Sequence, residues 1–168
     1  NMVKVESGTF YMGAQKDSVE FYCYDENATS LEGPVHEVTV SEFHINKYEV
    51  TQLLWESIMG LTPNDENDMQ WEKEYGLGDK YPAYRISYKE VETFISKLNE
   101  YTGLHFALPT EAQWEYAAKG GANTNYELYA GDGNVLEVAW IERNSDKSSE
   151  VGMKKPNGLG LYDMSGNV

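Results

Sequence analysis

The chain has 168 residues, a length that fits one domain. Its 40% hydrophobic and 13% aromatic content favours a folded protein over a disordered one, despite a net charge of −15. The excess of 28 Asp and Glu over 13 Lys and Arg repels phosphate backbones, which argues against nucleic-acid binding. No run approaches the roughly 20 apolar residues of a membrane helix. Cys23 is the only cysteine, so the chain has no internal thiol pair for a disulfide or a metal.

Short strands are expected in the first third of the chain. Residues 2–12 carry two alternating runs around a turn, which predicts a hairpin closed by Gly13. Residues 14–34 lose the alternation and gather acidic side chains, which predicts an exposed loop that folds back over the body. Its expected anchors are the aromatic residues Phe21, Tyr22 and Tyr24. Alternation returns in residues 35–50, where Ser41–Glu42 predicts a bulge or tight turn.

Three helices are expected next. Thr51 is a good N-cap for a helix that Gly60 would end, and residues 61–80 read as a polar loop. Apolar residues recur on one face over 88–101, which predicts an amphipathic helix. Thr110 opens a third helix with capping-box spacing to its glutamine. The residues expected to face inward on that helix are Trp114, Ala117 and Ala118.

Loops dominate the rest, with brief strands expected at 106–108 and 138–141 and turns at 131–134 and 156–158. A small antiparallel sheet, two or three helices and long ordered loops make an α+β arrangement.

Five motifs occur in a fixed order along the chain: residues 2–13 (MVKVESGTFYMG), 34–40 (PVHEVTV), 48–52 (YEVTQ), 108–118 (LPTEAQWEYAA) and 157–168 (NGLGLYDMSGNV). Together they resemble the formylglycine-generating enzyme (sulfatase-modifying factor) family, and its bacterial, Bacteroides-like members look closest. The resemblance implies a single C-type-lectin-like domain over residues 1–168. It also implies that Val168 falls inside the family's Gly-Asn-Val-Trp-Glu-Trp segment, so that the domain lacks its C-terminal portion.

The resemblance further implies a chemistry, the copper-dependent oxidation by O₂ of a sulfatase cysteine to formylglycine. Two thiolates hold the Cu(I) in that reaction, because soft sulfur ligands select this ion. The family keeps these cysteines beyond the region covered here, and Cys23 matches no catalytic position. No catalytic residue is therefore assigned, and Cys23 is interpreted as a buried or tolerated thiol.

Structural calcium is also implied by the resemblance, bound by side-chain and main-chain oxygens. A first site would use the side chain of Asn134, the carbonyl of Val135 and an acidic or amide residue farther on, Asp146 or Asn144. A second would use Asn167, with a glutamate partner that belongs to the missing segment.

For other polar residues a structural role is favoured over a functional one. Thr51 is expected to cap a helix, and Glu49 to be a buried, hydrogen-bonded carboxylate, with a substrate groove as the alternative. Glu111 and Glu115 lie one helical turn apart; dipole compensation for Glu111 and a packed or solvated Glu115 are favoured over a paired-acid role. The three histidines show no zinc-like spacing and are interpreted as core or surface residues: His36, His44 and His105.

Three hypotheses follow for the function. The chain is a non-catalytic binding or structural module that presents its loops to a protein, peptide or glycan partner. Alternatively, it is part of an active copper-dependent oxidase, or a calcium-stabilised component of a cell-envelope complex. An extracytoplasmic location, periplasmic or as a surface lipoprotein, is expected, with a signal or lipid-anchor segment removed before Asn1.

Overall fold

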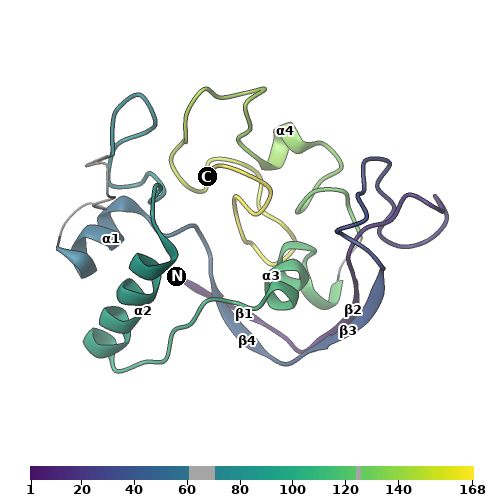
Figure 1. The fold of residues 1–168 in the computed structure, drawn as a ribbon, viewed down its shortest axis with the longest axis horizontal. Helices are drawn as coiled ribbons and strands as arrows, with labels where there is room; N and C mark the ends of the chain where they lie inside the picture. The colour runs from purple at the N-terminus through teal and green to yellow at the C-terminus, as the bar shows by residue number, and fades with distance from the viewer. Residues whose placement is uncertain (61–70, 124–125) are drawn as a thin grey trace.

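A computed structural model describes residues 1–60, 71–123 and 126–168 of the chain (Figure 1). The elements in chain order are β1 (Met2–Val5), β2 (Gly8–Met12), β3 (His36–Val40), β4 (Phe43–Asn46), α1 (Gln52–Met59), α2 (Tyr88–Thr102), α3 (Glu111–Ala118), the 3-10 turn η1 (Gly121–Asn123) and α4 (Val135–Val138). Figure 1 shows α1 and α2 together on one side, loop 14–34 on the other, and the C-terminal segment between them. None of the described helices is long and apolar enough to cross a membrane.

The strands form two antiparallel pairs, so the hairpin expected within residues 2–12 is wrong. β1 pairs with β4, placing Val5 opposite Phe43, and β2 pairs with β3, placing Gly8 opposite Val40. One register runs through both pairs, so no extra residue is inserted, and Ser41–Glu42 only interrupts the ladder instead of forming a bulge. Alternating side chains identify a strand but leave its partner open, which explains the wrong pairing.

A first hydrophobic core lies between these strands, α3 and the C-terminal segment. Its buried members are Val5, Phe10, Val40, Tyr116, Ala117 and Leu161. The rings of Phe10 and Tyr116 lie 5.1 Å apart between centroids, which joins the strands to the helix. Aromatic pairs at this distance add to the stabilisation that burial alone provides.

The capping box predicted for α3 is confirmed, because Thr110 and Gln113 bond each other's backbone N–H groups. Ala117 and Ala118 are buried as expected, but Trp114 is 45% exposed. The inward aromatic residue is Tyr116, which lies two residues and about 200° around the helix from Trp114. Helical spacing with Ala117 and Ala118 therefore did not predict which aromatic ring of α3 is buried.

A second hydrophobic core lies between α1 and α2, both of which were predicted. Trp55 and Phe94 stack with 5.0 Å between ring centroids, and Trp71 packs beside them. Thr51 caps α1, and glycines in the left-handed conformation end both helices. Of the polar loop expected at 61–80, residues 61–70 lie outside the described residues.

The two brief strands expected in the second half are wrong. Residues 106–108 are extended but unpaired, because the side chain of Asn99 bonds both the N–H and the carbonyl of Phe106. Val138 is the last residue of α4, and residues 139–141 follow that short helix; there the side chain of Asn144 donates to the Ala139 carbonyl and accepts from the Ile141 N–H. In both places an asparagine side chain satisfies the backbone locally, which removes the need for a strand partner.

Asn157 attaches the irregular C-terminal segment to α3. Its buried amide donates to the carbonyls of Ala117 and Ala118, and its side-chain oxygen accepts from the N–H groups of Leu159 and Leu161. The expected turn at 156–158 is displaced by about one residue, to a turn closed between Asn157 and Gly160. The hydrogen bonds of this one side chain hold the C-terminal segment to α3, as strand pairing would in a sheet.

We expect Asn157→Ala to lower the free energy of unfolding by roughly 3 kcal/mol, because two buried carbonyls lose their donor. Urea denaturation followed by circular dichroism measures the change. Asn27→Ala, at an exposed position in loop 14–34, is the control and should be close to neutral. Equal stability of the two variants would contradict the role given to Asn157.

Candidate functional site

Loop 14–34 returns to the body through stacked aromatic rings, as predicted for Phe21 and Tyr22. The rings of Tyr11 and Tyr22 stack at 4.8 Å between centroids, and Phe21 meets Tyr11 at 6.0 Å. Tyr126, from the segment after α3, packs on Tyr22 at 5.1 Å. Phe21 and Tyr22 nevertheless remain about half exposed, so this cluster both anchors the loop and faces solvent.

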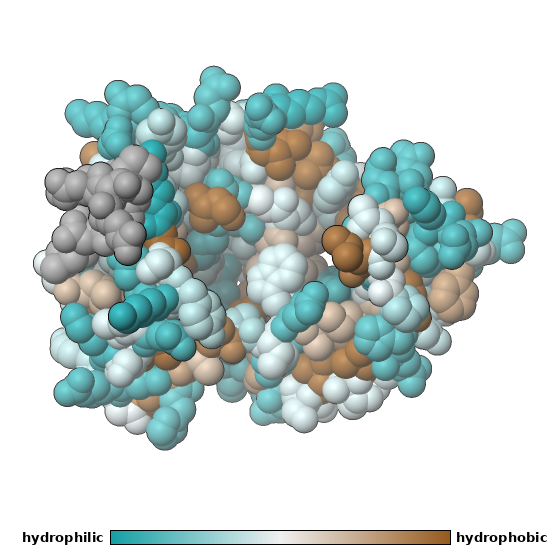
Figure 2. All heavy atoms as spheres, in the orientation of Figure 1, coloured by the Kyte–Doolittle hydropathy of each residue, from teal (hydrophilic) through white to brown (hydrophobic). Residues whose placement is uncertain are grey.

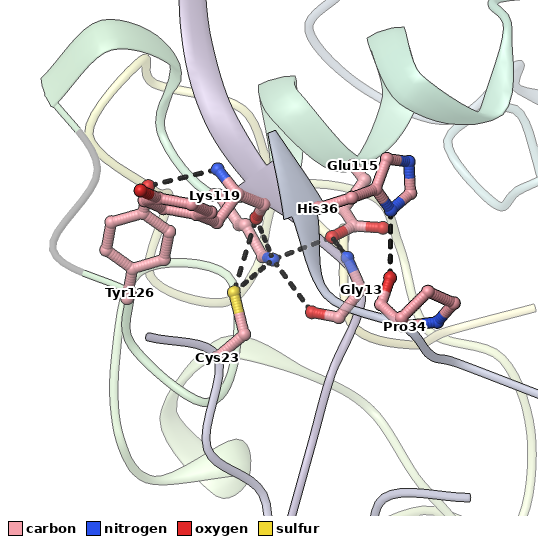
Figure 3. Close-up of polar contacts among 8 residues, drawn as sticks. Gly13, Cys23, Pro34, His36, Glu115, Lys119 and Tyr126 are labelled. Carbon is pink, nitrogen blue, oxygen red and sulfur yellow. Dashed lines mark hydrogen bonds and ion pairs between the residues drawn. The ribbon is translucent and has the colours of Figure 1, made fainter. Parts of the chain in front are cut away.

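Lys119, at the end of α3, lies at the centre of the contacts beneath this loop (Figure 3). Its Nζ atom donates to Glu115 Oε1 at 2.6 Å, to the carbonyls of Tyr11 and Gly13 at 3.0 and 3.3 Å, and to Cys23 Sγ at 3.3 Å. Glu115 also accepts from the Gly13 N–H at 2.8 Å. The ammonium group therefore ties β2, loop 14–34 and α3 to one point.

Glu115 is the packed carboxylate that the sequence favoured, while its partner Lys119 was not singled out. The spacing of four residues on a helix could have identified this ion pair. Glu111 is exposed in the first turn of α3, consistent with dipole compensation.

The thiol of Cys23 is held as a hydrogen-bond donor to the Tyr11 carbonyl, with 3.2 Å between Sγ and oxygen. Burial raises the pKa of Cys23, and this effect outweighs the lowering by nearby Lys119. The thiol therefore stays protonated near neutral pH. Because the thiolate is both the nucleophile and the metal ligand, Cys23 is poorly suited to either role.

A cavity of about 470 Å³ opens beside this thiol, between the end of β2, loop 14–34 and α3. We call it the loop–helix cavity; its lining includes Cys23, Glu32, His36, Glu115, Lys119 and Tyr126. Its volume lies within the usual range for sites that bind small ligands or side chains.

A second polar cluster lies where the C-terminal residues meet the segment before α1. Asn167 donates from Nδ2 to Glu49 Oε2 at 2.7 Å and accepts from the Ser149 N–H at 2.9 Å. Asp163 accepts from the Gly152 N–H at 2.7 Å through one carboxylate oxygen. The other oxygen, Oδ1, is buried and has no hydrogen-bond partner among the described residues.

The two carboxyl groups of this cluster resist ionisation. Burial, reinforced by the charge of Asp163, raises the pKa of Glu49 to about 7, against the lowering effect of its hydrogen bonds. Burial likewise raises the pKa of Asp163. Glu49 is thus the buried, hydrogen-bonded carboxylate that was predicted, whereas its neighbour Asp163 was missed.

Most of the residues named for calcium already make hydrogen bonds within the chain. Asn134 caps α4, and the Val135 carbonyl accepts from the Ala139 N–H. Asp146 is exposed, while the alternative Asn144 bonds the backbone of Ile141 and Ala139. Among residues 1–60, 71–123 and 126–168, no three His, Cys, Asp or Glu side chains gather as a metal-binding group. The calcium assignment stays a prediction.

The three histidines are surface residues, in agreement with their interpretation. His36, His44 and His105 are all exposed. Only His36 lines the loop–helix cavity, where its Nδ1 lies 2.9 Å from the Pro34 carbonyl oxygen.

Stability should fall as pH rises through the range set by Glu49. Its unfolded carboxyl has a pKa near 4.3, so between about pH 4.3 and 7 the folded state binds the proton more strongly. We expect the wild type to lose roughly 2 kcal/mol more than Glu49→Gln over this range, measured by urea denaturation in EDTA. The exposed Glu56→Gln variant should follow the wild type. Parallel curves for the wild type and Glu49→Gln would refute the assignment.

Comparison with known proteins places the chain among sulfatase-modifying factors. The model of the sulfatase-modifying factor enzyme 1-like domain matches residues 1–168. The chaperone protein LppX of Paenibacillus barcinonensis is 34% identical over 173 residues, covering 78% of this chain and 61% of LppX. The formylglycine-generating enzyme of Mycobacterium tuberculosis is 25% identical, covering 99% of this chain and 71% of the enzyme. The chain therefore spans only about three fifths of LppX.

Solved structures agree with this placement. PvdO from Pseudomonas aeruginosa superimposes with a TM-score of 0.77 at 27% identity, covering 99% of this chain and 67% of PvdO. Treponema denticola variable protein 1 superimposes with a TM-score of 0.74 at 26% identity, and the match covers 99% of this chain and 70% of that protein. CarF superimposes with a TM-score of 0.72 at 22% identity, and the match covers 100% of this chain and 77% of CarF. At this identity the likeness supports the fold alone. The chain belongs to the sulfatase-modifying factor enzyme 1-like domain family and has its C-type-lectin-like fold.

Proposed function

We propose that the chain acts as a non-catalytic binding module with a protein partner. The observation that carries this proposal is the state of Cys23, a lone thiol that donates to the Tyr11 carbonyl and whose pKa is raised by burial. Copper chemistry of the kind found in this family needs two thiolates on one Cu(I) ion. A single protonated thiol does not supply this pair, which supports the proposal of a recognition role for these residues.

Similarity to LppX supports a protein partner, because that relative is named a chaperone protein. An extracytoplasmic location, periplasmic or at the cell surface, is part of the same proposal. The loops suit this role, because a rigid core can present variable loops to a partner without changing fold.

The purified chain, incubated with copper, O₂ and a sulfatase peptide containing Cys-x-Pro-x-Arg, should form no aldehyde above the level of its Cys23→Ser variant. A hydrazide probe and mass spectrometry of the peptide measure the product. Aldehyde formed by the wild type and lost in Cys23→Ser would overturn the proposal.

A second candidate is that these residues belong to an active oxidase. It is favoured by the match to the mycobacterial enzyme, which covers nearly all of this chain but only 71% of that protein. The same assay on the product of the complete reading frame tests this candidate. Aldehyde from that product alone would assign the chain to an oxidase.

A calcium-binding role is proposed for the cluster around Asn167. Calcium prefers oxygen ligands, and this cluster combines the carboxylates of Glu49 and Asp163 with the buried, unpartnered Asp163 Oδ1. Burial, with a smaller contribution from the charge of Asp163, raises the pKa of Glu49, and a bound cation would oppose both effects. The groups at Asn134 and Val135 fit less well, since both already accept backbone hydrogen bonds in α4.

Added Ca²⁺ should raise the melting temperature of the wild type at neutral pH, because binding to the folded state alone stabilises it. The increase should be lost in Glu49→Gln and retained in Asn134→Ala, as read by differential scanning fluorimetry. Loss in Asn134→Ala alone would move the site to the α4 residues, and no increase in the wild type would end the calcium proposal.

A further inference from the structure

The rim of the loop–helix cavity combines exposed apolar side chains with carboxylates. The exposed apolar and aromatic residues of the lining are Tyr24, Leu31 and Leu128, and the half-exposed rings of Phe21 and Tyr22 lie beside it, with Tyr22 packed on the lining residue Tyr126. Figure 2 shows hydrophobic patches within the mainly hydrophilic lobe formed by loop 14–34, which Figure 1 places on the right. Apolar side chains gathered at the mouth of a cavity, with polar residues around them, are typical of an interaction surface.

The charge on this surface is strongly one-sided. Five carboxylates line the cavity, from Asp25, Glu32, Glu111, Glu115 and Glu127. Against them stand the imidazole of His36 and one ammonium group, that of Lys119. Lys119 is already paired with Glu115 and holds the backbone of β2 and loop 14–34, so its charge is used within the protein. The remaining carboxylates give the cavity a negative potential that favours a cationic occupant.

The shape of the surface favours an extended occupant. A smaller cavity of about 250 Å³ shares Lys119 and Glu127 with the loop–helix cavity and continues past the end of α3. Tyr24 lines the larger one, where its aromatic ring face can receive an ammonium or guanidinium group. Two hollows that share a wall suit consecutive side chains of one chain better than a single compact ligand.

We propose that this surface binds an extended basic segment of a partner polypeptide, in which Lys or Arg side chains alternate with apolar residues. Apolar side chains of the partner would pack on Leu31 and Leu128, and its cationic groups would meet the carboxylates and tyrosines of the cavity. This inference rests on the proposed role as a binding module and states what the module recognises.

Other occupants fit the surface less well. A second copy of the chain carries the same net charge of −15 and would be repelled. Anionic lipids and nucleic acids are repelled for the same reason. A neutral glycan would stack on the rings and donate hydroxyl groups to the carboxylates, but it carries no positive charge to offset theirs.

The test compares two short unstructured peptides, one of mixed Lys and Leu and one with Glu in place of every Lys. Fluorescence anisotropy with the purified chain should show binding of the basic peptide only. Its affinity should fall markedly between about 0.1 M and 1 M salt, where the Debye length shortens from about 10 Å to 3 Å.

Charge reversal at the cavity locates the site. Glu111→Lys with Glu127→Lys should weaken the basic peptide roughly tenfold at low salt, since two attractive contacts become repulsive. Glu92→Lys with Glu100→Lys makes the same change of charge on the exposed face of α2 and should have little effect. Tyr24→Ala should cost about two- to fivefold, and Tyr88→Ala, on exposed α2, should not.

Equal weakening by the two charge-reversed pairs, or equal binding of both peptides, would overturn the proposal, as would a preference for glycans or self-association at this surface. The aldehyde assay separates this result from the proposed function. Peptide binding together with copper-dependent oxidation by this chain would retain the surface and remove the non-catalytic role. If the chain neither binds the basic peptide nor oxidises the sulfatase peptide, the proposed binding surface is wrong and the non-catalytic role stands.

Discussion

The ammonium group of Lys119 is the interaction on which the candidate site depends. A partly buried charge needs a counter-charge and hydrogen-bond acceptors, because burial without them costs several kcal/mol. Glu115 supplies the counter-charge, and the carbonyls of Tyr11 in β2 and of Gly13 just after it supply acceptors. Cys23 brings loop 14–34 to the same point. The loop–helix cavity exists because these segments meet at one cation without closing over it.

The same arrangement sets the chemistry of the thiol. Lys119 alone would favour a thiolate and lower the pKa of Cys23. Burial has the larger effect, and the negative charge of Glu115 acts in the same direction as burial, so the pKa of Cys23 is raised. The family includes proteins named as enzymes and proteins named otherwise, such as LppX and PvdO, on one fold. Function therefore has to be argued from the side chains.

The second half of the chain is held together mainly by side-chain to backbone hydrogen bonds. Asn157 joins the C-terminal segment to α3, and Asn167 joins it to Glu49 and Ser149. The side chains of Asn99 and Asn144 likewise accept hydrogen bonds from backbone N–H groups, over shorter distances along the chain. Buried backbone groups must find partners wherever no sheet or helix provides them. This explains how so irregular a chain is ordered.

Sequence alone determined the features that depend on neighbouring residues. The three main helices, the caps at Thr51 and Thr110 and the family motifs were all readable, because helix periodicity and capping act over a few positions. Only the tertiary structure decided which strands pair, that Tyr116 and not Trp114 faces the core, and that Cys23 meets Lys119 across 96 positions. Such contacts depend on burial and charge balance among residues that only the complete fold brings together.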